Sequence, residues 1–240
     1  MDIRLEQASL HWQHHCVFSD LNLTLPSGRW TSILGQSGVG KSSLLQLLCG
    51  IADAADIKGR IICSDGRPLT GRVAWMAQQD LLLPWLSVLD NVLLGARLQG
   101  GKVSAEQAEQ ARYLLGQVEL GDRANARPAQ LSGGQRQRVA LARTLFQDQP
   151  LVCMDEPFSA LDAITRLKLQ DLAAALLADR TVLMITHDPL EALRLSDRIL
   201  VLQGAPARLS DPIVPVGQTP RAVHDDQVLQ LQAQLLELLA

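Results

Sequence analysis

The stretch that decides the fold is Gly35-Gln36-Ser37-Gly38-Val39-Gly40-Lys41-Ser42, which fits the pattern G-x-x-x-x-G-K-[ST] at every fixed position. An apolar strand-like run, residues 30–34, precedes it, and an apolar helical run, residues 44–49, follows it. Its glycines permit backbone angles that point successive N–H groups inward around an anion, and the helix N-terminus adds its positive dipole end. The order of strand, loop and helix predicts a phosphate-binding loop, in which Lys41 meets the β and γ phosphates and Ser42 meets magnesium.

A glycine turn that happens to precede a helix is the ordinary alternative for this stretch. The strand before it, the helix after it and the fixed lysine and serine all disfavour that alternative. The loop by itself predicts only that the protein binds a nucleoside triphosphate, because kinases, GTPases and motors share it. The choice among those classes therefore depends on the rest of the chain.

Further apolar, strand-like runs follow the loop, with helical stretches between several of them. They cover residues 73–77, 151–154, 182–185 and 199–202. Strands that alternate with helices predict an α/β fold with a largely parallel sheet. The first thirty residues instead alternate loosely between apolar and polar side chains and end at Pro26-Ser-Gly28, which predicts a layer of short antiparallel strands.

The middle of the chain, about residues 85–150, has a helical pattern with no convincing strand. Ser104 and Gln107 form a possible capping box ahead of a helix over 108–118. We therefore expect a helical insert within a domain that spans residues 1–205. The tail, residues 206–240, ends in a helix over 228–240 that we expect to pack on the same domain, a dimer contact being the alternative.

The composition excludes several classes of protein. A net charge of −3 provides no electrostatic reason to expect nucleic-acid binding. No apolar run approaches the roughly 18 residues that a membrane-spanning helix needs.

The N-terminus, Met-Asp-Ile-Arg-Leu-Glu, lacks a basic start and an apolar stretch, so we expect no secretory signal and a cytosolic protein. The four cysteines have no C-x-x-C spacing, so they predict neither a zinc site nor a redox pair.

Two adjacent acids, Asp155 and Glu156, follow the strand-like run 151–154, at the edge where a parallel sheet presents its ligands. We expect Asp155 to hold magnesium and Glu156 to act as the catalytic base that polarises the attacking water. His187 follows the run 182–185 and reaches the same edge, where it would contact the γ phosphate and the water. Histidines without such a placement are expected to be structural: His11, His14, His15 and His224.

A second anion site is predicted at Leu131-Ser132-Gly133-Gly134-Gln135, which precedes a helical run over 136–146. Ser132 can cap that helix, while the glycine N–H groups and the helix dipole attract a phosphate. A well-capped helix without a ligand is the ordinary alternative. A second phosphate cradle would be redundant in one chain unless it serves a nucleotide bound to a partner subunit.

Taken together, these motifs resemble the ATP-binding cassette (ABC) family, over nearly all of residues 1–205 and in the family's order. The stretch 131–135 looks like the family signature, which separates these ATPases from kinases and GTPases with the same phosphate loop. The resemblance implies a P-loop NTPase core with a mainly parallel sheet, an N-terminal antiparallel β layer and an inserted helical subdomain. It also implies binding of ATP and Mg²⁺, ATP hydrolysis, and a head-to-tail pair of copies with each ATP between the two.

The resemblance assigns further roles residue by residue. Trp12, where tyrosine is commoner, matches the aromatic that stacks on adenine, although core packing is a competing interpretation because tryptophan is usually buried. Gln78 matches the glutamine that links magnesium to the transporter interface, and Asp162 ends the Ser159-Ala-Leu-Asp162 loop that crosses the dimer. The implied nucleotide contacts are Trp12, Gly35, Gln36, Ser37, Gly38, Val39, Gly40, Lys41, Ser42, Ser43, Ser132, Gly133, Gly134, Gln135 and Asp162. The implied metal ligands are Ser42, Gln78 and Asp155, and the implied catalytic residues are Lys41, Gln78, Glu156 and His187.

Residues 78–92 are similar to the importer group that handles nitrate, sulfonates, taurine and the pyrimidine precursor of thiamine. Leu, Pro and Trp at 82–85 would form an apolar surface on which a permease helix docks, a buried connection being the alternative for Leu82 and Leu83. The implied partners are a second copy, membrane permease subunits and, indirectly, a solute-binding protein, at the cytoplasmic face of the inner membrane.

Two other functions stay open at this point. One is a soluble cassette ATPase that acts on ribosomes or DNA, although such proteins commonly carry paired cassettes or a long coiled-coil insertion. The other is an adapter that binds ATP without hydrolysing it, which Glu156 and His187 disfavour.

Overall fold

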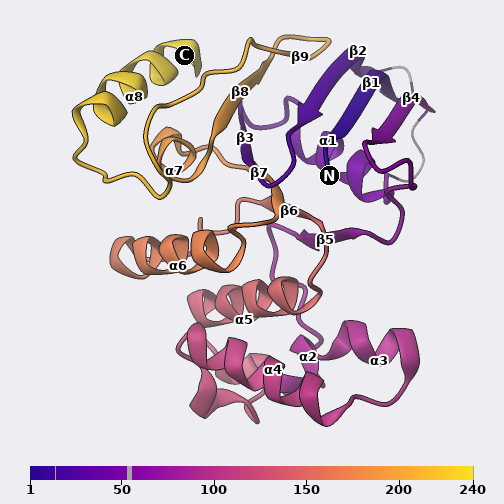
Figure 1. Cartoon of the computed structure of the whole chain (residues 1–240), viewed down its shortest axis with the longest axis vertical. Coiled ribbons are helices and arrows are strands. Elements are labelled where there is room, and N and C mark those ends of the chain that lie inside the picture. The colour runs from indigo at the N-terminus through magenta and orange to yellow at the C-terminus, as the bar shows by residue number, and fades with distance from the viewer. Residues whose placement is uncertain (14, 53–55, 240) are drawn as a thin grey trace. The chain divides into compact units, whose positions relative to one another are not determined.

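The computed structural model describes residues 1–13, 15–52 and 56–239, and the chain divides into two compact units. The first unit comprises Met1–Val73, Pro150–Glu156 and Leu177–Ala240, and the second comprises Ala74–Gln149 and Pro157–Leu176 (Figure 1). The chain thus leaves the first unit and returns to it twice. The predicted division into a 1–205 domain, an insert over about 85–150 and a 206–240 tail stays a prediction.

The first unit contains an antiparallel sheet in the strand order β2-β1-β4. Its strands are β1 (Ile3–Trp12), β2 (His15–Leu25) and β4 (Asp56–Cys63). The first two are the antiparallel layer that the alternating pattern predicts, and Ile3 and Leu5 of β1 are buried. The sequence did not predict β4, because its first six residues are all exposed and show no apolar alternation.

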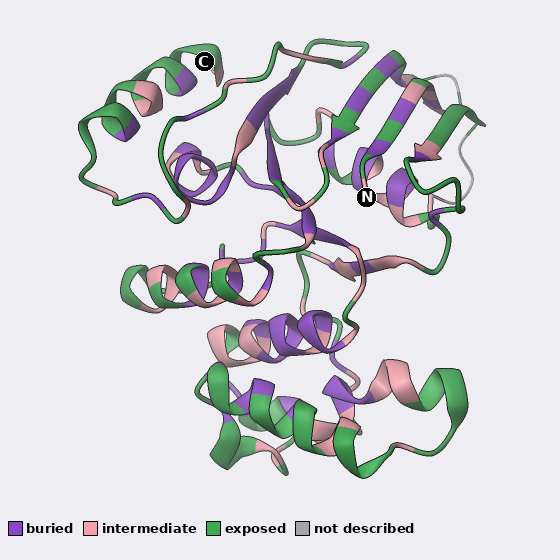
Figure 2. Cartoon of the chain, in the orientation of Figure 1, coloured by how far each residue is buried: buried purple, intermediate pink, exposed green. Residues whose placement is uncertain are grey.

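A second sheet in this unit has the strand order β6-β7-β3-β8-β9. The first four strands pair in parallel, and β9 pairs antiparallel with β8. Their bounds are β3 (Trp30–Leu34), β6 (Leu151–Asp155), β7 (Thr181–Ile185), β8 (Arg198–Gln203) and β9 (Arg208–Leu209). Every residue of β3, β6 and β7 is buried (Figure 2), which confirms the predicted α/β fold with a mainly parallel sheet.

Three helices complete the first unit: α1 (Lys41–Cys49), α7 (Pro189–Leu195) and α8 (Asp226–Leu239). Val228 and Leu235 of α8 are buried in one cluster with residues of β3, β8 and α7. Leu238, in the last turn of the same helix, is 48% exposed. Three positions after Leu235, it lies about 60° away around the helix, at the border of the buried face.

The second unit is mostly helical, apart from β5 (Val73–Met76), whose first residue belongs to the first unit. Its α-helices are α2 (Val88–Val92), α3 (Leu94–Gly100), α4 (Ala105–Gln117), α5 (Gly133–Phe146) and α6 (Ala163–Leu176), and its 3₁₀ turns are η1 (Gly121–Arg123) and η2 (Pro128–Gln130). The predicted capping box of Ser104 and Gln107 is present at the start of α4. Both α2 and α4 pack on α5, which therefore forms the centre of this unit.

Across the described parts of the chain, the structure contains no helix that combines the length and the apolar character needed to span a membrane.

A buried arginine fastens the segment that leads into α8. The Arg221 side chain is only 5% exposed and donates five hydrogen bonds of 2.7–3.2 Å, all of them to backbone carbonyls. The acceptors lie at the end of α7 and in the loop before Arg221: Leu193, Ser196, Pro215, Val216 and Gly217. Burial lowers the pKa of Arg221, and the charges of Asp197 and Asp225 oppose that shift.

We predict that Arg221→Met lowers the free energy of unfolding by about 2–3 kcal/mol, because it keeps the apolar stem but leaves buried carbonyls without a donor. The measurement is the urea unfolding midpoint of the full chain. Arg208→Met, at an exposed position in β9, is the control and should leave the midpoint unchanged. Equal midpoints for both variants would contradict the role given to Arg221.

Candidate nucleotide-binding site

The phosphate loop connects β3 to α1, as the sequence predicts, and two of its glycines have no room for a side chain. A Cβ atom on Gly35 would lie 2.4 Å from the carbonyl oxygen of Leu202. Gly40, the N-cap residue of α1, has a φ of 110°, and a Cβ there would lie 2.5 Å from Cγ1 of Val17. The loop is therefore closely packed against β8 at one end and against β2 at the other.

Lys41 is buried within this loop, with 7% of its surface exposed. Its ammonium group donates to the carbonyl oxygens of Gly35, at 2.7 Å, and Gln36, at 2.9 Å. Burial lowers the pKa of Lys41, while the nearby charges of Glu156 and Asp155 act in the opposite direction. The loop therefore holds a cation near Asp155 and Glu156, at the end of β6.

Asp155 and Ser42 meet at the centre of this arrangement. Asp155 ends β6, Ser42 lies in the first turn of α1, and their side chains are hydrogen-bonded. Burial raises the pKa of Asp155, and the Ser42 hydroxyl partly offsets that shift. A carboxylate and a hydroxyl are hard oxygen donors of the kind that Mg²⁺ prefers.

Two of the residues predicted for catalysis, Glu156 and His187, are neighbours. Oε1 of Glu156 lies 3.2 Å from Nδ1 of His187, and their side chains are 18% and 63% exposed. The backbone of Glu156 has a φ of 48°, which is strained for a residue with a side chain, and its N–H donates to the carbonyl of Ile185 at 2.8 Å. The ends of β6 and β7 thus bring together two side chains that are 31 positions apart in the sequence.

A cavity of about 420 Å³ lies beside the loop, and Trp12 forms part of its wall. Trp12 is 37% exposed, so the structure does not support core packing as its role. His15, which we expected to be structural, lines the same cavity. His14 lies outside the described residues. The lining residues are Trp12, His15, Cys16, Val17, Gly38, Val39, Gly40, Ser43, Gly204 and Ala205.

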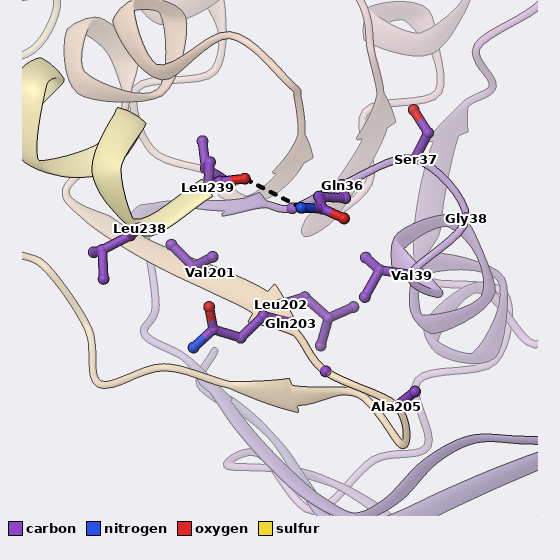
Figure 3. Close-up of a pocket in the computed structure, with 12 residues that line it drawn as sticks. Gln36, Ser37, Gly38, Val39, Val201, Leu202, Gln203, Ala205, Leu238 and Leu239 are labelled. Atoms are coloured by element: carbon purple, nitrogen blue, oxygen red, sulfur yellow. Dashed lines mark hydrogen bonds between the residues drawn. The ribbon is translucent and has the colours of Figure 1, made fainter.

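A neighbouring cavity of about 550 Å³ also borders the loop (Figure 3). It shares Gly38, Val39, Gly204 and Ala205 with the cavity beside Trp12. The first half of the loop, the end of β8 and the last turn of α8 form its walls. The loop therefore borders two cavities that share part of their lining.

The remaining predicted residues belong to the second unit. Ser132 caps α5 as predicted: its hydroxyl accepts from the N–H of Gln135 at 3.2 Å, and the Gln135 side chain accepts from the N–H of Ser132 at 2.9 Å. Asp162 accepts from the N–H of Thr165 at 3.0 Å, and that bond lowers the Asp162 pKa. Gln78 is exposed on the segment after β5. Gly133 and Gly134 form the first turn of α5.

Sequence reasoning missed a polar cluster in the second unit. Nε of Arg136 lies 2.9 Å from a carboxylate oxygen of Asp80, and Arg143 donates to the carbonyls of Asp80 and Leu81 at 2.6 and 2.8 Å. Arg136 and Arg143 are seven positions apart on α5, which places them on one helix face and was the available signal. The cluster fixes the turn before the apolar segment in which Trp85 is 66% exposed.

Known proteins similar to this chain are ATP-binding proteins of ABC transporters. The family model described as ABC transporter matches residues 18–159. A Haemophilus influenzae protein described as an uncharacterized ABC transporter ATP-binding protein is 48% identical over 98% of this chain and 97% of its own length. The aliphatic sulfonates import ATP-binding protein SsuB 2 of Pseudomonas syringae is 41% identical over 98% of this chain and 96% of its own. The aliphatic sulfonates import ATP-binding protein SsuB 1 of Paracoccus denitrificans is 44% identical over 88% of this chain and 82% of its own length.

Two solved structures with the same fold are dimeric cassettes. One is an ATP-binding cassette dimer in a post-hydrolysis state bound to ADP and Pi. It aligns with a TM-score of 0.77 at 30% identity and covers 90% of this chain and 100% of that chain. A bacterial ABC transporter cassette dimer aligns with a TM-score of 0.76 at the same identity and coverage.

We predict that Gly35→Ala weakens ATP binding at least about tenfold, because the added methyl group would overlap the carbonyl oxygen of Leu202 and displace the loop. Titration with a fluorescent ATP analogue measures the effect. Gly100→Ala is the matched control, since a Cβ at Gly100 meets nothing within 4 Å. Wild-type affinity in Gly35→Ala would show that the loop does not need this close contact.

Proposed function

This chain belongs to the ABC transporter family as an ATP-binding subunit, and from that premise we propose that it powers the import of an aliphatic sulfonate through a separate permease. Members of this family hydrolyse ATP, and so does this chain. The cargo is inferred from relatives named as aliphatic sulfonate importers, at 41–44% identity over most of the chain. No residue of this subunit is assigned to the cargo, because the permease carries it.

The loop and Trp12 are proposed to hold the nucleotide. The exposed indole of Trp12 lies in the wall of the cavity beside Gly38 to Ser43, which supports stacking on adenine with the phosphates in the loop. The loop N–H groups, the N-terminal end of α1 and Lys41 would bind the phosphates. The remaining loop positions, Gln36, Ser37 and Val39, would contribute through their backbones.

Ser42 and Asp155 fit a magnesium ion, since their hard oxygen atoms already meet in a hydrogen bond. Gln78, from the second unit, is proposed as a further ligand. When bound, the ion would neutralise charge on the β and γ phosphates. Lys41 is buried near Asp155, and a buried ammonium group attracts the phosphates more strongly than one in water.

Glu156 is proposed as the catalytic base. Its carboxylate would accept a proton from the water that attacks the γ phosphate, a form of help that contributes about 10² to 10⁴ in rate. His187, at 3.2 Å from Glu156, would orient that water and contact the γ phosphate. The strained backbone of Glu156 supports a functional position, because strain of this kind clusters at active sites.

We place a second copy of the chain across the nucleotide. The capped N-terminus of α5, residues Ser132 to Gln135, would bind the γ phosphate of an ATP held by the loop of the other copy. Asp162 would lie at the interface between the two copies, at the end of the loop that crosses the dimer. Dimeric cassettes at 30% identity, one of them bound to ADP and Pi, support this pairing.

The permease is proposed to dock on the exposed apolar segment that contains Leu81, Pro84 and Trp85. Leu82 is buried, as the alternative interpretation of that residue expected. This docking would place the subunit at the cytoplasmic face of the inner membrane, with a solute-binding protein acting indirectly from the other side. A soluble cassette ATPase acting on ribosomes or DNA is not favoured, because the similar relatives are named as transporter subunits.

Glu156→Gln tests the catalytic assignment. We expect ATP binding within about twofold of wild type, loss of hydrolysis by at least about 100-fold, and an ATP-dependent dimer in sedimentation, since the amide cannot accept the proton. Lys41→Ala, the contrasting control, should instead weaken ATP binding. Unchanged turnover in Glu156→Gln would exclude Glu156 as the base.

The growth of a strain that lacks this subunit tests the proposed identity of the cargo. A strain that lacks this subunit should fail to use an aliphatic sulfonate as its sulfur source, should grow normally on sulfate, and should recover with wild-type protein but not with Glu156→Gln. Trp85→Ala should keep the ATPase activity of the isolated chain and lose this rescue, because Trp85 is exposed in the docking segment. Normal growth of the deletion strain on both sulfur sources would reject the sulfonate assignment.

A further inference from the structure

Helix α8 lies against the strands from which the phosphate loop emerges. Its residues Val228 and Leu235, 2% and 0% exposed, are buried in a cluster with Leu34 of β3 and Val201 of β8. Leu34 is the residue directly before Gly35, and Val201 is directly before Leu202, whose carbonyl supports Gly35. The terminal helix therefore packs on the base of the loop.

The last turn of α8 also contacts the loop itself. Leu239 is partly buried against the same cluster, and its carbonyl oxygen accepts a hydrogen bond of 3.3 Å from the side-chain amide of Gln36 (Figure 3). The last carbonyls of an α-helix have no partner inside the helix, so Gln36 supplies a donor that one of them lacks. Leu239 thus packs on the cluster at the base of the loop and accepts a hydrogen bond from the loop itself.

Gln36 continues this connection to the buried lysine. Its backbone carbonyl accepts from the ammonium group of Lys41 at 2.9 Å, beside the 2.7 Å bond to Gly35. One residue therefore contacts α8 through its side chain and Lys41 through its backbone. Displacement of Gln36 would change the position of the group that is proposed to meet the phosphates.

Between the closely packed Gly35 and Gly40, the loop borders a cavity on this side. The cavity of about 550 Å³ separates residues 35–39 from much of the last turn of α8, whose Leu238 and Leu239 form its opposite wall (Figure 3). A loop that borders a cavity has few packed neighbours to resist a shift. The contact between Gln36 and Leu239 crosses that space and limits such a shift.

We propose that α8 is a positioning element for nucleotide binding: its last turn fixes Gln36 and, through Gln36, Lys41. The inference deepens the proposed ATP site and rests on it. Because the hydrogen bond is exposed, its loss should change ATP affinity by only a few fold. The rate of the chemical step should stay the same, since Glu156 and His187 follow other strands, β6 and β7.

Leu239→Ala is the first test, because it removes packing that holds the last turn in place. We expect the dissociation constant of a fluorescent ATP analogue to rise about fivefold, with kcat at saturating ATP within about twofold of wild type. Leu236→Ala is the matched control, since Leu236 is 53% exposed on the same helix and should have no effect. Leu239→Met should restore most of the affinity.

Gln36→Ala separates this role from a general loss of stability, because Gln36 is exposed and outside the core. If Gln36 acts through Leu239, the double variant Gln36→Ala/Leu239→Ala should bind ATP no more weakly than the weaker single variant. Additive losses in the double variant, or wild-type affinity in both single variants, would overturn the proposal.

Lys41→Ala distinguishes failure of this inference from failure of the proposed ATP site. If wild type binds the analogue and Lys41→Ala does not, the ATP site holds, and the Leu239 and Gln36 variants decide the role of α8. If wild type and Lys41→Ala bind the analogue equally weakly, the proposed site itself is wrong, and with it the role of α8.

Discussion

The parallel pairing of β3, β6, β7 and β8 is the constraint on which the rest of the site depends. Parallel strands all end at one edge of their sheet, so whatever follows each strand converges there. The phosphate loop follows β3, Glu156 follows β6, His187 follows β7, and the Gly204 turn follows β8. A site built this way needs no long-range recognition between its parts, because backbone hydrogen bonds have already placed them.

Electrostatics at this edge are balanced within the protein. The buried ammonium group of Lys41 lies near two backbone carbonyls and two carboxylates. Burial disfavours the charge on Lys41 and on Asp155, while each of these groups stabilises the charge on the other. An arriving triphosphate would meet a cation that is held in place and only weakly hydrated, which increases the strength of the attraction.

The second unit contains the proposed second anion site. Its α5 begins in a capping box with glycines in its first turn, and Arg136 and Arg143 hold the turn near Asp80 from the same helix. The signature residues and the proposed docking segment are therefore attached to one rigid element. This arrangement is suited to a subunit that must report the state of its nucleotide to a partner, because a movement of α5 would displace both.

The sequence alone determined the fold class and supplied most of the candidate site residues, because both depend on local patterns: glycine spacing in a loop, apolar runs for buried strands and capping residues at helix starts. Tertiary structure decided what has no local signal. The exposed strand β4 forms through pairing with β1, and the Asp80 cluster and the contact from Leu239 to Gln36 join residues 56 and 203 positions apart. Contacts of that kind arise only when the sheet and the helices have packed, since single-sequence patterns report short-range periodicity and not which surfaces will meet.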